Sequence, residues 1–218
     1  MNKRNDGPLN TSVQISKTQS TDDKCQIAEC IYDTDPYIYP VAFGECRERA
    51  IEAISRLIGM NGTLFDYRNI IVARADHRVC GVCVLSGGSG SWSSGDILDD
   101  LGEDFAQRQL RDGFIYASEH YFSRIGEGLD HNEVELVICC VHQDFRRMHI
   151  ASRMLDCILD PDGEFRGKRI QLTVLEENKS AIKLYRNKGF RVVEEDVPGF
   201  AAEGLPRPAT WIMARDVL

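Results

Sequence analysis

The sequence predicts a mixed α/β (α+β) fold, and three observations support this prediction. Apolar runs at 133–141, 169–175 and 210–214 have the length of buried strands, and stretches of helical period lie between them. Two further apolar runs within 69–86 flank a tight polar turn, which is the pattern of a β-hairpin. The chain has no internal repeat at solenoid or propeller spacing. Strands that alternate with helices in this way predict a sheet covered by helices.

The first half of the chain begins with a short strand at 13–15, where apolar and polar residues alternate. Asp22 and Asp23 mark the start of a helix, because acidic side chains are favoured in a first turn. Two prolines predict that the segment 33–40 is a fixed, non-helical connection. A second helix begins at about Gly44 and turns one apolar face to the core. That face comprises Ala50, Ile51, Ile54, Leu57 and Ile58.

The centre of the chain contains a long connection. Residues 86–96 are rich in glycine and serine, which predicts flexibility, and the segment exceeds the usual connection length, which makes it a candidate for function. A helical stretch follows from about 98 to 125, and we expect an interruption near Gly113. The remaining predicted elements are strand 133–141, helix 150–159, strand 169–175, helix 178–188, and strands 190–194 and 210–214.

Composition limits the domain organisation and the partners. Residues 1–10 are polar and lack periodicity, so we expect a flexible tail followed by a single domain over 11–218. The start of the chain has no apolar run that resembles a secretory signal, so the eight cysteines are expected to be reduced in the cytoplasm. No stretch approaches the roughly 20 apolar residues that cross a bilayer, so no membrane partner is expected. The net charge of −8 argues against nucleic acid and favours an amine-bearing partner.

The cysteines do not predict a metal site. Cys80 and Cys83 form a CxxC pair, but regular strand alternation would send their side chains to opposite faces of the sheet. The same argument applies to the adjacent Cys139 and Cys140. We therefore expect most of these thiols to be small buried hydrophobic groups.

The segment DFRRMHIASRML, residues 144–155, leads from the strand 133–141 into a helix. A helix start has unpaired N–H groups and a partial positive charge, and Arg146, Arg147 and Arg153 add formal charge nearby. The stretch therefore predicts a pyrophosphate site. Taken alone, it fits a solvated basic surface equally well.

A second motif favours the pyrophosphate site. In IQLTVLEENKSAIKLYRNKGF, residues 170–190, Asn178 stands seven residues before Tyr185, and a Gly-Phe pair follows. Together the two motifs resemble the GCN5-related N-acetyltransferases (GNAT). The resemblance is firm over 133–190 and weaker in the hairpin and in the last strand.

The family's loop for the donor diphosphate follows the pattern Gln or Arg, two residues, Gly, one residue, Gly or Ala. Those positions hold Arg146, His149 and Ala151 here, so His149 replaces a glycine. Contacts to phosphate come mainly from backbone N–H groups, which histidine also has, but glycine is usual where the chain takes a positive φ. We therefore expect binding to be retained with altered affinity.

The resemblance implies a GNAT fold, in which helices flank a central, mixed and mostly antiparallel sheet. Its fourth and fifth strands, 133–141 and 169–175, would splay apart around the acyl donor, acetyl-CoA. The residues that it places against this cofactor are Cys139, Cys140, Val141, Arg146, Arg147, Met148, His149, Ile150, Ala151, Ser152, Asn178 and Tyr185.

Two catalytic residues are also implied. Glu135 matches the strand glutamate that removes a proton from the acceptor amine, directly or through water, and Tyr185 matches the tyrosine that protonates the CoA sulfur. The structural alternatives are a solvent-facing strand residue for Glu135 and a core tyrosine for Tyr185. Asn178 is predicted to cap its helix, with or without an added contact to the cofactor.

The acceptor is the least constrained part of this interpretation. Asp33, Asp35, Tyr37 and Tyr39 could hold a cationic amine through charge and aromatic faces, and a solvated acidic surface is equally consistent. The predicted function is acetyl transfer from acetyl-CoA to a primary amine of a small molecule or a peptide. The alternative is a non-catalytic acyl-CoA-binding module with a degenerate loop. The long segment 86–130 is a candidate lid or homodimer contact.

Overall fold

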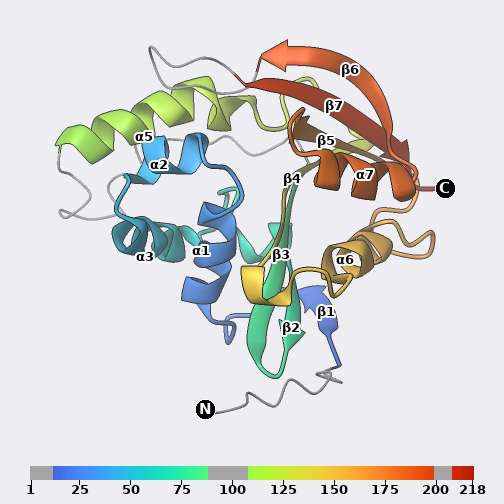
Figure 1. The fold of residues 1–218 in the computed structure, drawn as a ribbon, viewed down its shortest axis with the longest axis horizontal. Helices are drawn as coiled ribbons and strands as arrows, with labels where there is room; N and C mark the ends of the chain where they lie inside the picture. Colours follow the sequence, from blue (N-terminus) through green and yellow to red (C-terminus); the bar gives the residue numbers. More distant parts are fainter. Residues whose placement is uncertain (1–11, 88–107, 199–207) are drawn as a thin grey trace, which may run out of the picture.

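The computed structural model describes residues 12–87, 108–198 and 208–218 (Figure 1). The predictions for the tail 1–10, for most of the glycine-rich segment 86–96 and for 98–107 lie outside these residues. Seven strands form one sheet in the order β1-β2-β3-β4-β5-β7-β6. The strands are β1 Gln14–Lys17, β2 Ile70–Ala75, β3 Arg78–Ser86, β4 Glu133–Val141, β5 Arg169–Leu175, β6 Arg191–Pro198 and β7 Ala209–Asp216.

Only the β4–β5 pair of this sheet is parallel, and every other neighbouring pair in the described chain is antiparallel. The predicted mixed, mostly antiparallel sheet is therefore confirmed. The predicted strand at 133–141 and the one at 169–175 match β4 and β5 residue for residue.

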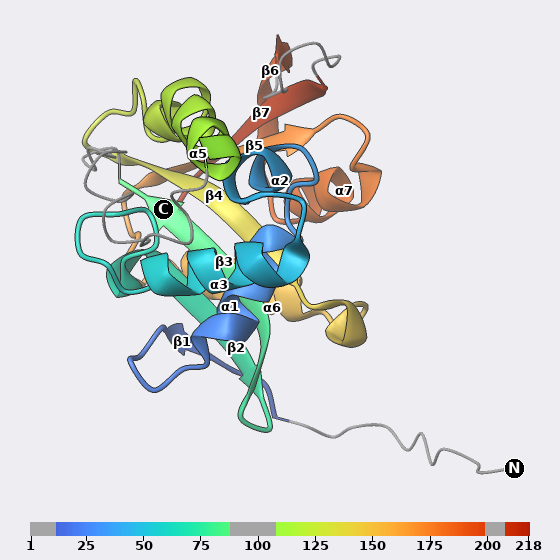
Figure 2. The same ribbon diagram turned by 90° about the vertical axis from the view of Figure 1, so that its left-hand side faces the viewer.

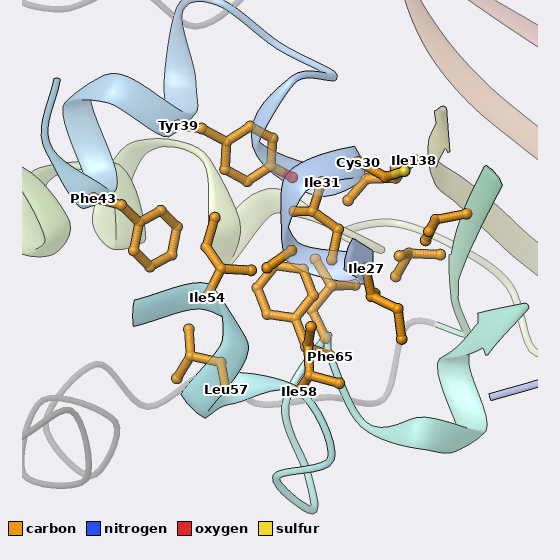
Figure 3. Packing of buried hydrophobic residues seen from close by; sticks show 14 of the residues in the cluster. Ile27, Cys30, Ile31, Tyr39, Phe43, Ile54, Leu57, Ile58, Phe65 and Ile138 are labelled. Carbon is orange, nitrogen blue, oxygen red and sulfur yellow. The ribbon is translucent and has the colours of Figure 1, made fainter. Parts of the chain in front are cut away.

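Helices cover both faces of the sheet (Figures 1 and 2). The α-helices are α1 Lys24–Tyr32, α2 Ile38–Phe43, α3 Arg47–Leu57, α5 Arg108–His120, α6 Ile150–Ile158 and α7 Lys179–Asn187, with short 3₁₀ turns η1 Tyr67–Asn69, η2 Phe122–Arg124 and η3 Gln143–Phe145. One buried cluster joins α1, α2, α3 and α5 to the sheet, and a second joins α6 and α7 to its other face. Figure 3 shows the first cluster, in which Phe43, Ile54 and Phe65 interlock. No helix in the described ranges is long and apolar enough to span a bilayer.

Local sequence explains the start of α1. The Asp23 carboxylate caps α1 by accepting hydrogen bonds from the amides of Cys25 and Gln26, at 2.9 and 3.2 Å. The apolar face predicted for the next helix is buried in α3 and in the residue after it.

The segment 33–40 is not wholly non-helical, which corrects the prediction. Helix α2 begins at Ile38 and includes Pro40 in its first turn. The amides of a first turn have no partner within the helix, so proline loses no hydrogen bond there. The Asp35 carboxylate accepts from the amides of Tyr37 and Ile38, at 2.7 and 3.1 Å, and satisfies this helix start.

Gly113 does not interrupt α5, which runs through it to His120. A Cβ at this position would lie 2.3 Å from the carbonyl oxygen of Val41 in α2. The glycine is there because the two helix backbones touch, and not because the helix ends. The prediction of a break at Gly113 is therefore wrong.

A bulge also corrects the prediction for the CxxC pair. The β2–β3 register shifts at Ala73 and Arg74, which leaves Cys80 as an extra residue in β3. The bulge reverses the alternation, so Cys80 and Cys83 belong to the same buried cluster. Both thiols are fully buried, as expected, and no group of metal-ligating side chains occurs in the described residues.

The parallel strands β4 and β5 separate soon after they meet. They pair only from Glu133 to Glu135, opposite Arg169 to Gln171. The β3–β4 register shifts immediately beyond, where Val137 is the extra residue of a β-bulge. A bulge bends the strand that carries it. The rest of β4 therefore has no strand partner on its β5 side in the described chain.

Candidate active site

The separation of β4 from β5 opens a cleft with a volume of about 790 Å³. The two strands form its floor, and the starts of α6 and α7 form one end of its wall. The α1–α2 connection, the end of α5 and the residues after it to Glu127 line another side, and Val197, Pro208, Thr210 and Ile212 contribute from the β6–β7 hairpin side. The cleft is therefore built from segments far apart in the sequence.

The loop between β4 and α6 presents a row of unpaired amides. None of the N–H groups from Arg147 to Ser152 donates a hydrogen bond within the described residues, and α6 has no side-chain cap. Arg147 and His149 both adopt left-handed backbone, with φ of 66° and 57°. Left-handed residues next to right-handed ones turn successive N–H groups to the same side and form a concave anion site. This loop has the geometry that suits a phosphate group.

Charged side chains around this loop have different roles. Arg146 lines the cleft, and its Nε donates to the carbonyl oxygen of Val141 at 3.3 Å. Arg153 instead donates from Nη2 to the carbonyl oxygen of Val13 at 2.8 Å, so its guanidinium holds β1. The His149 side chain is exposed to solvent and is not part of the cleft wall.

Glu135 lies on the cleft wall at the last residue of β4 that pairs with β5. Its Oε2 accepts a hydrogen bond from the amide of Gly126 at 2.7 Å. No hydrogen bond to Oε1 exists in the part of the chain that the structure describes. Burial raises the pKa of this carboxyl above its ordinary value, and the Gly126 amide lowers it by less. The result is an oriented carboxylate with one oxygen free and an increased affinity for a proton.

Tyr185 lies on the opposite wall, on α7. Its side chain is 8% exposed, its ring packs edge-on against Phe190 with centroids 5.7 Å apart, and its hydroxyl lies beside the Cys139 thiol on β4. Burial is the main cause that raises the pKa of the phenol well above its ordinary value. The phenol therefore stays protonated at neutral pH and is placed to donate a proton into the cleft.

Comparisons with known proteins agree with this geometry. Residues 103–190 match the family model described as "Acetyltransferase (GNAT) family". The matched residues include β4, the loop between β4 and α6, β5 and α7. Over residues 103–190 the chain is similar to the GNAT acetyltransferase family. A search of curated proteins gives no significant match.

Solved structures support the same GNAT fold. A structure titled "The crystal structure of acetyltransferase" has a TM-score of 0.63 and 23% identity, covering 94% of this chain and 100% of its own. An N-acetyltransferase from Staphylococcus aureus Mu50 has a TM-score of 0.60 and 15% identity, with 93% and 100% covered. The ribosomal-protein-S18-alanine N-acetyltransferase from Escherichia coli has a TM-score of 0.51 and 15% identity, with 94% of each chain covered. At these identities the likeness concerns the fold.

The GNAT cleft gathers part of the residue set predicted from the sequence. Seven predicted cofactor residues line it: Cys139, Cys140, Val141, Arg146, Ala151, Asn178 and Tyr185. Arg147, Met148, His149, Ile150 and Ser152 do not line it and belong to the adjacent loop of unpaired amides. Ile150 is buried in the core beneath the loop. Asn178 caps α7, as predicted, because its Oδ1 accepts from the Ala181 amide at 3.1 Å.

The four acceptor-side candidates separate in the structure. Asp33 lines the cleft but forms an ion pair with Arg47, at 3.0 Å. Tyr37 is not a lining residue, and its hydroxyl donates to Glu177 Oε1 at 3.3 Å. Asp35 and Tyr39 both line the cleft. Sequence reasoning did not separate these two pairs, because the connection has no regular period from which side-chain direction can be read.

Other residues of the GNAT cleft were missed. Tyr116, His120 and Tyr121 line it from the end of α5 and the residue after it. The Tyr116 and His120 rings are stacked with centroids 4.3 Å apart, and the two residues stand four apart on one helix face. That spacing is the one signal in the sequence that could have found them.

Proposed function

We propose that this chain is an acetyl-CoA-dependent N-acetyltransferase that transfers an acetyl group to a primary amine by direct attack on the thioester. The observation that supports the proposal is the cleft itself, because Glu135 on β4 and Tyr185 on α7 both line it where the two strands have come apart. The neighbour named for ribosomal protein S18 alanine illustrates an amine acceptor on the same fold.

The chain's own groups fit the parts of acetyl-CoA. The unpaired amides from Arg147 to Ser152 would hold its diphosphate, and the free edge of β4 around Cys140 and Val141 would pair with the pantetheine arm. Acetyl-CoA, when bound, supplies an acyl group activated as a thioester. An N–H at Cys140 or Val141 would polarise its carbonyl.

Glu135 is the proposed general base. An acceptor enters as an ammonium ion, which must lose a proton before its nitrogen can attack. The free Oε1 of Glu135 would take that proton, directly or through water. Because burial raises the pKa of the carboxyl, this pKa is closer to the pKa of the amine.

Tyr185 is the proposed general acid. The new N–C bond forms as the C–S bond breaks, and the electron pair of that bond leaves on the CoA sulfur. The protonated phenol of Tyr185 would donate its proton there, and its contact with Cys139 holds the hydroxyl at the cleft.

Replacing His149 by glycine is expected to keep acetyl-CoA binding or to tighten it by a few-fold. The φ of 57° is strained for histidine and natural for glycine, and the loop donates through its backbone. Titration calorimetry measures the affinity. His149→Val is the matched variant, because a β-branched side chain does not tolerate this backbone, and we expect it to weaken binding by about tenfold or more. Loss of binding in His149→Gly would show that the imidazole is itself a ligand.

A thiol-release assay tests the proposed function. Purified protein with acetyl-CoA is offered polyamines, aminoglycosides, amino acids and peptides with free N-termini, and CoA release is followed with a thiol reagent. We expect release with at least one amine class and acetylated amine by mass spectrometry. Acetyl-CoA binding without release for any amine would instead support the non-catalytic acyl-CoA-binding module.

We also propose that the chain acts in the cytoplasm as one domain over residues 11–218. All eight cysteines are free, which is the state expected in a reducing compartment. The sheet draws its strands from Gln14 to Asp216, so its order does not divide the sequence into separate units.

A further inference from the structure

The cleft wall formed by the α1–α2 connection and by the end of α5 contains a second half-buried carboxylate, Asp35. Burial raises the pKa of Asp35, against the smaller effect of the two amides that it accepts. Both of those bonds go to Oδ1. No hydrogen bond to Oδ2 exists within the described residues, although Asp35 lines the cleft. Asp35 thus resembles Glu135, since each uses one oxygen to hold a backbone amide and keeps the other free.

A tyrosine hydroxyl beside Asp35 is also without a partner. Tyr39 is only 2% exposed, and no hydrogen bond to its hydroxyl exists in the described chain. Every fully buried side-chain oxygen or nitrogen of the described residues is hydrogen bonded, so the Tyr39 hydroxyl must reach the cleft that the residue lines. Figure 3 shows the ring extending from α2 toward α1. A nearly buried hydroxyl that ends in the cleft is ready to bind a ligand there.

The two carboxylates line the same cleft. Burial is the main cause that raises the pKa of Tyr121 and of Tyr39. The charges of Asp35 and Glu135 raise the pKa of Tyr121 further, and the charge of Asp35 raises that of Tyr39. Two exposed residues of opposite charge, Arg124 and Glu127, line the same cleft. Asp33 is neutralised by Arg47, and the His120 ring nitrogen Nδ1 lies 2.9 Å from the carbonyl oxygen of Tyr116. Among the described residues, the lining of the cleft therefore holds two half-buried carboxylates without an ion pair, whereas the arginines that line it, Arg124 and Arg146, are exposed.

We infer that the acceptor is a diamine or a longer polyamine, whose reacting amine lies at Glu135 and whose second ammonium lies at Asp35. An amine with one charge would pair with Glu135 and leave the half-buried Asp35 without a counter-ion, which costs free energy. A second ammonium offers three N–H donors, which suit Asp35 Oδ2 and the Tyr39 hydroxyl. The inference rests on the proposed function, since it specifies the acceptor of the same cleft.

A matched substrate series tests the inference. The kcat/KM of the full-length protein with acetyl-CoA is measured for α,ω-diamines of increasing length and for the n-alkylamines with the same number of carbons. We expect the best diamine to exceed its monoamine by at least about tenfold, the value of one charged hydrogen bond. Asp35→Asn should reduce this ratio to near one, because asparagine keeps an oxygen for the two amides but removes the charge. Tyr39→Phe should reduce the ratio of diamine to monoamine kcat/KM by less than Asp35→Asn does.

Glu127→Gln is the control, because it removes the same charge from the exposed rim of the cleft and should leave the diamine preference intact. Equal kcat/KM for diamines and monoamines, or an unchanged preference in Asp35→Asn, would overturn the inference while leaving acetyl transfer standing. If no amine is acetylated, the proposed function fails instead. Calorimetric titration of the protein and its CoA complex with the diamines still tests the inference in that case. Binding that Asp35→Asn does not weaken would refute it.

Discussion

Tyr185→Phe is expected to lower kcat by about 100-fold or more while changing acetyl-CoA affinity by no more than a few-fold. The substitution removes the phenolic proton that would go to the departing sulfur, and it leaves the ring packed on Phe190. Stopped-flow measurement of CoA release gives the rate, and calorimetry gives the affinity. The variant should unfold at nearly the same temperature as the parent chain, because the packing of the ring on Phe190 is kept.

Tyr67→Phe is the control for this variant, because Tyr67 lies in η1 and does not line the cleft. It should turn over normally. Unchanged turnover in Tyr185→Phe would remove the acid role of this residue and leave it as a packing residue of α7.

The second large effect is expected for Glu135→Gln, which should lower kcat/KM at neutral pH by about 100-fold to 1000-fold. In the parent chain, activity should rise with pH as Glu135 loses its proton, at a midpoint above the ordinary pKa of glutamate, because burial raises the pKa. That limb of the pH–rate profile should be absent from the variant. A set of rates over the acidic and neutral range, measured with saturating acetyl-CoA, checks both expectations.

The contribution of Glu135 to folding stability should fall as pH rises, whereas activity should rise. Because the pKa of Glu135 is raised on folding, its contribution to stability is present below the ordinary pKa and is lost as pH rises through the folded value. The charged carboxylate therefore costs stability at neutral pH. Glu135→Gln removes this cost and keeps an acceptor for the Gly126 amide, so its melting temperature should equal or exceed that of the parent.

Glu133→Gln is the control for Glu135→Gln, because it removes the same charge from β4 at a residue that is not the proposed base. Glu133 is two residues away, lies 3.6 Å from Arg169 and does not line the cleft. This variant should keep normal turnover. If it loses activity while Glu135→Gln does not, the base has been assigned to the wrong glutamate.

The fold was predicted best where an apolar run or a helix-capping residue marks the bounds of an element. The bounds of β4 and β5 follow from apolar runs of strand length, and the α7 cap follows from Asn178. The errors have a shared origin in tertiary contact. The sequence does not show that Gly113 touches the α2 backbone, or that a bulge brings Cys80 and Cys83 into one cluster.

The sequence predicted part of the cleft lining and missed the part from α5. Glu135 lies in the strand before the first motif, Asn178 and Tyr185 lie in the second motif, and all three line one cleft in the structure. Tyr121 and its neighbours on α5 reach the cleft only because α5 packs on α2. A contact between segments so far apart leaves no period or motif in either one.

The touching backbones at Gly113 and Val41 also bear on how an acceptor would be chosen. Helix α2 carries Tyr39, α5 carries Tyr116 and His120, and the Phe43 and Phe114 rings interlock between them with centroids 5.6 Å apart. Without spare room at this crossing, neither helix can slide past the other, and both must move as one rigid body. Selection at this wall would then depend on a preformed shape that a substrate either matches or does not, and an enlarged residue at 113 would alter substrate choice from a distance.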